Sequence, residues 1–97
     1  MKTPAPSKIP YLILIQNKAE EDLAWFEKND RAGYKKCMDL IRAIAKNPRE
    51  GIGQPERVKY FKEETYSRRV NQKDRLVYVI YEKDKKVHIS ACKGHYE

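Results

Sequence analysis

The stretch Arg75–Tyr81, which reads Arg-Leu-Val-Tyr-Val-Ile-Tyr, is the only long uninterrupted run of β-branched and aromatic residues in the chain. Apolar side chains occupy both its odd and its even positions, so a strand of this composition must bury both faces. We therefore predict that it is the central strand of a sheet. The arginine at its entrance, with Arg68 and Arg69 upstream and His95 and Tyr96 near the C-terminus, indicates that the sheet carries a phosphate-handling site.

The length of 97 residues is enough for one small domain with a single core. Lys and Arg number 21 against 14 Asp and Glu, which gives a formal net charge of +7. Such a surface favours an anionic partner, either a nucleic acid or an acidic protein. No apolar stretch approaches the roughly 20 residues that a membrane span needs. We therefore expect a cytoplasmic protein with no membrane partner.

The two cysteines, Cys37 and Cys92, each lie inside an apolar pattern, and no CxxC or Cys/His cluster accompanies them. We predict that both are buried thiols, with a single disulfide as the alternative. No carboxylate or histidine cluster occurs at metal-ligand spacing, so we predict no metal site and no cofactor.

The first half of the chain predicts a tail, a strand and two helices. Residues 1–10 contain three prolines with Lys and Ser, so we expect a disordered tail before a single domain over 11–97. Residues 11–15 are a predicted strand. Asn17 and Glu20 have the spacing of a capping box for a helix over 18–28. Asp30 is expected to cap a second helix that ends at Asn47-Pro48, and the apolar residues of this helix recur at helical spacing: Tyr34, Cys37, Met38, Ile41, Ile44 and Ala45.

The second half of the chain predicts a sheet. Residues 49–56 are rich in Gly and Pro and form a predicted loop. Strands are expected over 58–61, 66–70, 75–81 and 87–92, with short turns between them. This order predicts an α+β domain in which an N-terminal strand and an antiparallel two-helix hairpin pack on a mainly antiparallel sheet of four to five strands.

Five short motifs follow one another in this half: Glu50-Gly51-x-Gly53-x-Pro55-Glu56 with Lys59, Tyr66-Ser-Arg-Arg69, Arg75-Leu-Val-Tyr78, Ala91-Cys92 and His95-Tyr96. Together they resemble the YoeB/Txe toxins of the RelE-like superfamily, over about residues 13–96. The resemblance implies a RelE-like, microbial ribonuclease-like fold. It also implies an mRNA interferase, which is a ribosome-dependent endoribonuclease that cuts messenger RNA and is held inactive by a cognate antitoxin. Operator DNA would be bound only through the antitoxin complex, and a homodimer is left open.

RNA cleavage without a metal needs a base for the 2′-hydroxyl proton, a cation for the charge on the phosphorane and an acid for the departing 5′-oxygen. Glu56, Arg75 and His95 supply one of each. The resemblance implies that Glu56 is the general base, His95 the general acid and Arg75 the transition-state clamp. It assigns Tyr96 to base stacking or to orienting the acid.

The resemblance further implies that substrate is bound by Lys59, Arg69, Arg68 and Tyr66, the first two as phosphate contacts. Each has an ordinary alternative. Strand alternation places the two arginines on opposite faces, where they could be surface charges that protect a sheet edge. Lys59 could be merely solvated, and Tyr66 could be a core or rim aromatic.

The three reactive residues also have structural alternatives. A charged loop residue such as Glu56 is usually solvated, and Glu50 is its rival as the base. Arg75 could pair with a nearby acid such as Asp74 or Glu82. His95 could be a frayed tail residue.

Two other functions are compatible with the sequence. One is a basic RNA-binding or ribosome-binding module without catalysis, and the other is a co-repressor that acts by pairing with its antitoxin. The family pattern is also altered at two places. Thr65-Tyr66 stands where an aromatic pair is common, and Lys93-Gly94 stands where bulkier or more basic residues are common.

Overall fold

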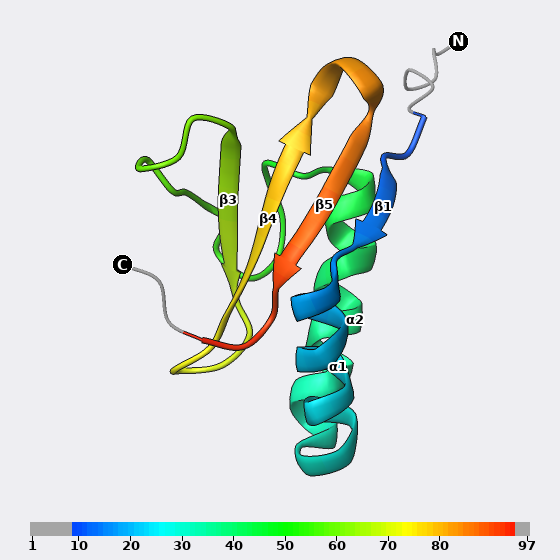
Figure 1. Ribbon diagram of the computed structural model, residues 1–97, viewed down its shortest axis with the longest axis vertical. Helices are drawn as coiled ribbons and strands as arrows, with labels where there is room; N and C mark the ends of the chain where they lie inside the picture. The colour runs from blue at the N-terminus through cyan, green and yellow to red at the C-terminus, as the bar shows by residue number, and fades with distance from the viewer. Residues whose placement is uncertain (1–8, 95–97) are drawn as a thin grey trace, which may run out of the picture.

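The computed structural model describes residues 9–94 of the chain (Figure 1). Within these residues the elements are β1 Leu12–Ile15, α1 Asn17–Asn29, α2 Arg31–Lys46, β2 Glu56–Arg57, β3 Glu64–Arg69, β4 Arg75–Tyr81, the 3-10 helix η1 Glu82–Asp84 and β5 Lys86–Ala91.

The strands of residues 9–94 form one five-stranded sheet in the order β1-β5-β4-β3-β2, with β4 in the middle. Neighbouring strands are antiparallel except β1 and β5, which run parallel. The helices α1 and α2 form an antiparallel hairpin against β5 and β1 (Figure 1). The predicted α+β architecture and the central place of Arg75–Tyr81 are therefore confirmed.

The core lies between the helix hairpin and one face of the sheet. In β4, Leu76, Tyr78 and Ile80 face this core and are at most 4% exposed, where they join helix residues such as Phe26 and Leu40. Val77 points to the other face and is also buried. Both faces of the central strand are thus covered at its start, as the continuous apolar run predicts.

The helix hairpin depends on a tight turn at Asp30. The Asp30 carboxylate accepts a hydrogen bond from the Gly33 backbone nitrogen at 3.0 Å, so its predicted capping role is confirmed. The predicted cap of the first helix is wrong. Gln16 occupies that N-cap without a side-chain bond, and Asn17 is already helical, because the Gln16 carbonyl accepts the Glu20 backbone nitrogen and starts the helix one residue earlier.

The strand predicted over 58–61 is also wrong. Strand β2 ends at Arg57, and after the Val58 backbone nitrogen bonds to the Thr65 carbonyl the chain leaves the sheet as an exposed turn. Tyr60 and Phe61 have no core to face there and are 75% and 46% exposed. Strand β3 accordingly begins at Glu64, two residues before the expected position.

Cys37 and Cys92 are buried free thiols, as predicted, and the structure has no disulfide between them. Hydrogen bonding to Cys37 and burial both raise the pKa of the Cys92 thiol, so it stays protonated. No helix within residues 9–94 is both long enough and apolar enough to cross a membrane.

Gly33 is needed for the close approach of the two helices. A Cβ atom added there would lie 2.6 Å from the Phe26 ring and 2.7 Å from the Asp30 carboxylate. We expect Gly33→Ala to lower the free energy of unfolding by about 1–3 kcal/mol through overpacking, although Ala gains about 1 kcal/mol in helix propensity. Urea unfolding measures the change. In a double-mutant cycle, Phe26→Leu should remove much of the penalty. A Gly33→Ala protein more stable than the parent would contradict this packing argument.

Candidate active site

Strand register brings three of the predicted site residues to one face of the sheet. Glu56 in β2 pairs with Ser67 in β3, and Arg69 in β3 pairs with Arg75 in β4. Paired residues, and residues two apart in a strand, share a face. These four side chains therefore lie together on the face turned away from the core, which we call the outer face. We call Glu56, Ser67, Arg69 and Arg75 the arginine cluster.

Arg75 is held in place by oxygen acceptors on two sides. Its Nε donates to the Ser67 hydroxyl at 2.8 Å, and one Nη donates to the carbonyls of Gln54 at 3.2 Å and Ser67 at 3.3 Å. The same Nη lies 3.6 Å from the Glu56 carboxylate. The other Nη makes no hydrogen bond to residues 9–94. An arginine held this way presents an unused donor in a fixed direction, which suits a phosphate oxygen.

The side chains of Arg75 and Glu56 differ in their exposure to solvent. The Arg75 side chain is 12% exposed, whereas the Glu56 side chain is 71% exposed. A substrate hydroxyl can therefore reach the carboxylate while the guanidinium stays fixed below it. The alternative partners of Arg75 are wrong, since Asp74 bonds Asn71 and Gly94. Glu82 lies in a separate network with Arg49, Tyr11 and Lys85.

Glu82 belongs to the opposite end of β4. Hydrogen bonds from Lys85, Tyr11 and Arg49 lower the pKa of Glu82 to about 2. Its neighbour Glu64 also has a lowered pKa, mainly because Arg49 donates two hydrogen bonds to it. These charges fasten the start of β1 and the loop after α2 to the sheet, away from the arginine cluster.

The loop between α2 and β2, residues 47–55, supplies backbone groups to the cluster. The Gln54 carbonyl accepts from Arg75, and the Gly53 carbonyl accepts the Arg69 backbone nitrogen at 2.7 Å. Gln54 has a φ of 52°, a left-handed conformation that costs a non-glycine residue about 1 kcal/mol or more. Gly53 has a φ of 86°, and a Cβ there would lie 2.6 Å from Leu40. The loop thus packs against the core at Gly53 and contacts the arginine cluster at Gln54.

Arg68 fixes this loop from the core side. It is fully buried and donates to the Tyr78 hydroxyl at 2.9 Å. It also donates to three loop carbonyls, those of Asn47, Glu50 and Ile52. These contacts give Arg68 a structural role and do not support the prediction that it binds substrate. Its donors face the protein interior, where a phosphate cannot reach them.

Tyr66 also lies on the core side. Its ring stacks on the Tyr78 ring with centroids 6.0 Å apart and packs against the core cluster. Strand alternation turns it away from the arginine cluster, so its packing agrees with the alternative of a core or rim aromatic, and its substrate contact stays a prediction. Lys59 is exposed in the turn after β2, and Glu50 is exposed in the loop before it. Among residues 9–94, neither side chain makes a hydrogen bond or ion pair to the arginine cluster.

The predicted acid and its neighbour, His95 and Tyr96, lie outside the described residues. The residue before them is placed, because the Arg75 backbone nitrogen donates to the Gly94 carbonyl at 3.0 Å. The C-terminal segment therefore leaves the described structure beside the arginine cluster.

Sequence reasoning missed the groups that orient Arg75. Ser67 had a signal, since it stands between Tyr66 and the two arginines of one motif. The Gln54 carbonyl had none, because a backbone acceptor carries no side-chain signature. The described residues contain no group of three or more His, Cys, Asp or Glu side chains that could hold a metal ion.

The family model for the YoeB-like toxin of bacterial type II toxin-antitoxin systems matches residues 15–96. The chain belongs to this family. It is 42% identical to Toxin YoeB of Synechocystis over 76 residues, which are 78% of this chain and 86% of the relative.

Solved structures of this family agree with that assignment. A YoeB dimer from Staphylococcus aureus is 38% identical with a TM-score of 0.79, and the match covers 91% of this chain and all of that one. A YoeB-YefM complex from the same organism gives 36% identity, a TM-score of 0.75 and the same coverage. The resemblance read from the five motifs is therefore confirmed.

Substitution of Arg68 in this YoeB-like toxin should lower the free energy of unfolding strongly, whereas the same substitution of its neighbour Arg69 should have little effect. Arg68→Met would remove the donor of the buried Tyr78 hydroxyl and of three part-buried loop carbonyls, and an unsatisfied buried group costs about 1–3 kcal/mol. We expect a loss of at least about 3 kcal/mol in the free energy of unfolding. Arg69→Met, on the exposed side, should change stability by less than about 0.5 kcal/mol. Thermal and urea unfolding of the two variants measure the contrast, and equal losses would refute it.

Proposed function

We propose that this YoeB-like toxin is an mRNA interferase that cleaves messenger RNA on the ribosome by attack of the 2′-hydroxyl. The observation that carries the proposal is the oriented Arg75, which has one Nη that donates to none of residues 9–94 and lies 3.6 Å from an exposed carboxylate. A fixed cation beside an accessible base is what cleavage of a ribose phosphodiester requires.

In the proposed reaction, Glu56 takes the proton from the 2′-hydroxyl while that oxygen attacks the adjacent phosphorus. The Arg75 guanidinium donates to a phosphoryl oxygen as negative charge builds on it, and Arg69 adds a second positive charge from the paired position of β3. His95 then protonates the 5′-oxygen as its bond to phosphorus breaks. The products are a 2′,3′-cyclic phosphate and a 5′-hydroxyl.

The arginine cluster is suited to charge that develops during the reaction. Ser67 and the Gln54 carbonyl hold Arg75 before substrate arrives, so little reorganisation is needed when the phosphorane forms. Two arginines face one carboxylate, so the cluster has a net positive charge that attracts RNA. Lys59, exposed three residues after Glu56, would contact a flanking phosphate.

The proposed partners follow from charge and family. The Staphylococcus aureus relatives are a YoeB dimer and a YoeB-YefM complex. We propose a YefM-like antitoxin for this chain, since its net charge of +7 favours an acidic partner that covers the arginine cluster. Operator DNA would be reached through that complex, and the toxin would act in the cytoplasm.

The acid and the base are tested by Glu56→Gln and His95→Ala. Each should slow single-turnover cleavage of ribosome-bound mRNA by about 10² to 10⁴, because a general acid or base contributes that much. Ribosome affinity should stay near that of the parent. Mapping of product ends should find 2′,3′-cyclic or 3′-phosphates and 5′-hydroxyls.

Lys28→Gln in α1 is the matched control, since Lys28 is exposed and distant in sequence from the cluster. It should cleave normally. Ribosome binding without cleavage by the parent protein would favour the non-catalytic RNA-binding function instead. Full cleavage by both site variants, or 5′-phosphate ends, would exclude the proposed mechanism.

A further inference from the structure

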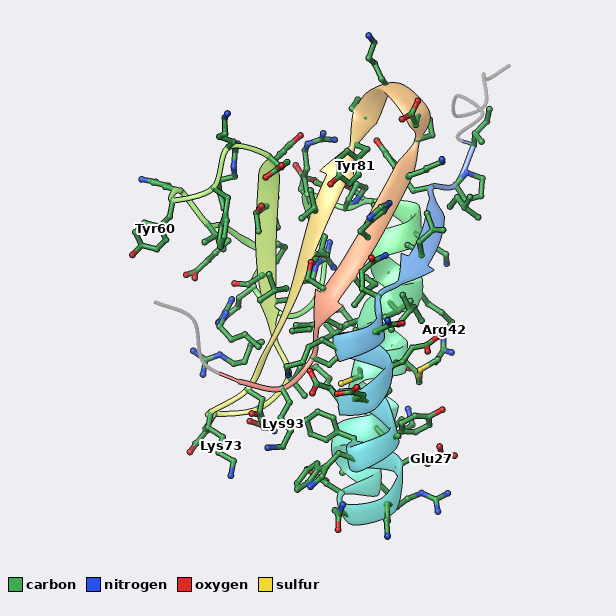
Figure 2. All side chains as sticks on the ribbon, in the orientation of Figure 1. Glu27, Arg42, Tyr60, Lys73, Tyr81 and Lys93 are labelled. Atoms are coloured by element: carbon green, nitrogen blue, oxygen red, sulfur yellow. The ribbon has the colours of Figure 1, made fainter. Side chains whose placement is uncertain are left out.

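Three consecutive backbone amides after β5 are bound by carboxylates from distant parts of the chain. Asp22 of α1 accepts from the Cys92 nitrogen at 2.9 Å and from the Lys93 nitrogen at 3.1 Å, both at Oδ2. Asp74 of the β3–β4 turn accepts from the Gly94 nitrogen at 3.0 Å. We call the two carboxylates and these amides the carboxylate clasp. Figure 2 shows Lys73 of the turn and Lys93 at the same end of the sheet.

Both carboxylates are buried and themselves fixed. Asp22 is 6% exposed, and both its oxygens accept from Lys18 at 2.7 Å. Asp74 is 5% exposed and accepts from the Asn71 side-chain amide at 3.0 Å, while the Asn71 oxygen accepts the Asp74 backbone nitrogen. Burying a carboxylate is unfavourable unless its hydrogen bonds are made. The clasp is therefore a built feature rather than a chance contact.

The clasp ends beside the arginine cluster. The Gly94 backbone nitrogen donates to the Asp74 carboxylate. The Gly94 carbonyl accepts from the backbone nitrogen of Arg75, the residue that follows Asp74. Gly94 has a φ of 126°, which a residue with a side chain rarely adopts. The backbone of Gly94, the last residue that the structure describes, is thus held at both its nitrogen and its carbonyl oxygen.

We propose that Asp22 and Asp74 are positioning residues, which fix the backbone of residues 92–94 immediately before the proposed general acid, His95. The inference rests on the proposed function, because it gives that general acid its placement. Neither carboxylate touches substrate. Loss of either would free the backbone before His95, and a displacement of about 1 Å in a reacting group can cost about 10²-fold in rate.

The test compares Asp22→Ala and Asp74→Ala in the full-length toxin with Asp22→Asn and Asp74→Asn. An asparagine keeps a carbonyl oxygen that can accept the same amide, whereas an alanine removes it. Single-turnover cleavage at saturating ribosomes should fall about 10- to 100-fold in the alanine variants. The ribosome concentration for half-maximal rate should change less than about threefold, since the clasp does not bind substrate. The asparagine variants should recover much of the rate.

Ile44→Ala is the matched control for stability, because Ile44 is fully buried in α2 and makes no clasp bond. It should lower the melting temperature but leave the cleavage rate of the folded protein unchanged. Amide exchange of residues 92–94, which needs no ribosome, should accelerate in the alanine variants and not in Ile44→Ala. Rates that fall only with the folded fraction, or unchanged amide exchange, would overturn the inference. A parent protein that fails to cleave would overturn the proposed function itself.

A separate observation concerns the turn between β2 and β3. Tyr60 and Phe61 stand next to each other there, 75% and 46% exposed, with the exposed lysines Lys59 and Lys62 on either side. Figure 2 shows Tyr60 projecting from this turn on the side of the sheet away from the helices. Paired exposed rings between positive charges fit single-stranded nucleic acid, whose bases stack on aromatic faces while its phosphates meet the lysines.

We infer that Tyr60 and Phe61 stack on bases of the RNA strand next to the phosphodiester that the proposed site cleaves. This also rests on the proposed function for its substrate. Tyr60→Ala and Phe61→Ala should each weaken binding of a short single-stranded oligoribonucleotide by about fivefold or more, since base stacking contributes about 1–3 kcal/mol. Tyr60→Trp should retain binding. The cleavage rate at saturating ribosomes should stay within about threefold of the parent.

Leu12→Ala is the control for this surface, because Leu12 is a 57% exposed apolar residue on the other edge of the sheet. It should not affect RNA binding. Unchanged RNA affinity of the Tyr60 and Phe61 variants would overturn the inference. If these variants bind RNA normally but bind the antitoxin more weakly, the turn is a contact for the antitoxin instead. RNA binding is measured without cleavage, so its loss or retention is distinct from failure of the proposed reaction.

Discussion

A buried guanidinium must find acceptors for its donors, and for Arg68 they come mainly from the loop between α2 and β2. Three loop carbonyls and the Tyr78 hydroxyl surround this side chain. The Tyr78 hydroxyl donates in turn to the Pro48 carbonyl. The loop is therefore bound to the middle of the sheet, although it contains no regular secondary structure. Without this attachment, the Gln54 carbonyl would have no fixed position from which to orient Arg75.

Successive side chains of β3 point to opposite faces of the sheet, so some stabilise the loop and the core while others belong to the arginine cluster. Arg68 and Tyr66 face inward and hold the loop and Tyr78, while Ser67 and Arg69 face outward and belong to the arginine cluster. Neighbouring residues of one motif thus perform different tasks because a strand turns successive side chains to opposite faces. The motif Tyr66-Ser-Arg-Arg69 therefore combines residues that support the loop with residues that belong to the candidate site.

The sequence predicted the architecture well where periodicity extends over many residues. The apolar run of Arg75–Tyr81 and the amphipathic second helix specify their own burial, so β4 and α2 were placed correctly. The turn after β2 was mistaken for a strand. The sequence shows that Tyr60 and Phe61 are aromatic, but not that they are exposed to solvent rather than packed on the core. Local spacing similarly favoured Asn17 as a cap, although backbone bonding begins at Gln16.

For the candidate site, the sequence predicted which residues take part but not the face of the sheet to which each side chain points. Strand pairing brings Glu56, Arg69 and Arg75 to one face of the sheet, which agrees with the prediction that they act together. Arg68 and Tyr66 were assigned to substrate because residue type alone cannot distinguish an inward arginine or tyrosine from an outward one. The acceptors of Arg75 could not be predicted at all, because one is a backbone carbonyl from a loop 21 residues away in sequence.

The candidate site is assembled from segments that meet only in the complete fold. Arg75 depends on the loop through Gln54 and on β3 through Ser67, and the C-terminal segment depends on α1 through Asp22. Contacts of this range form late and together, since each requires closure of a long stretch of chain. The geometry of the candidate site is therefore coupled to folding of the whole sheet.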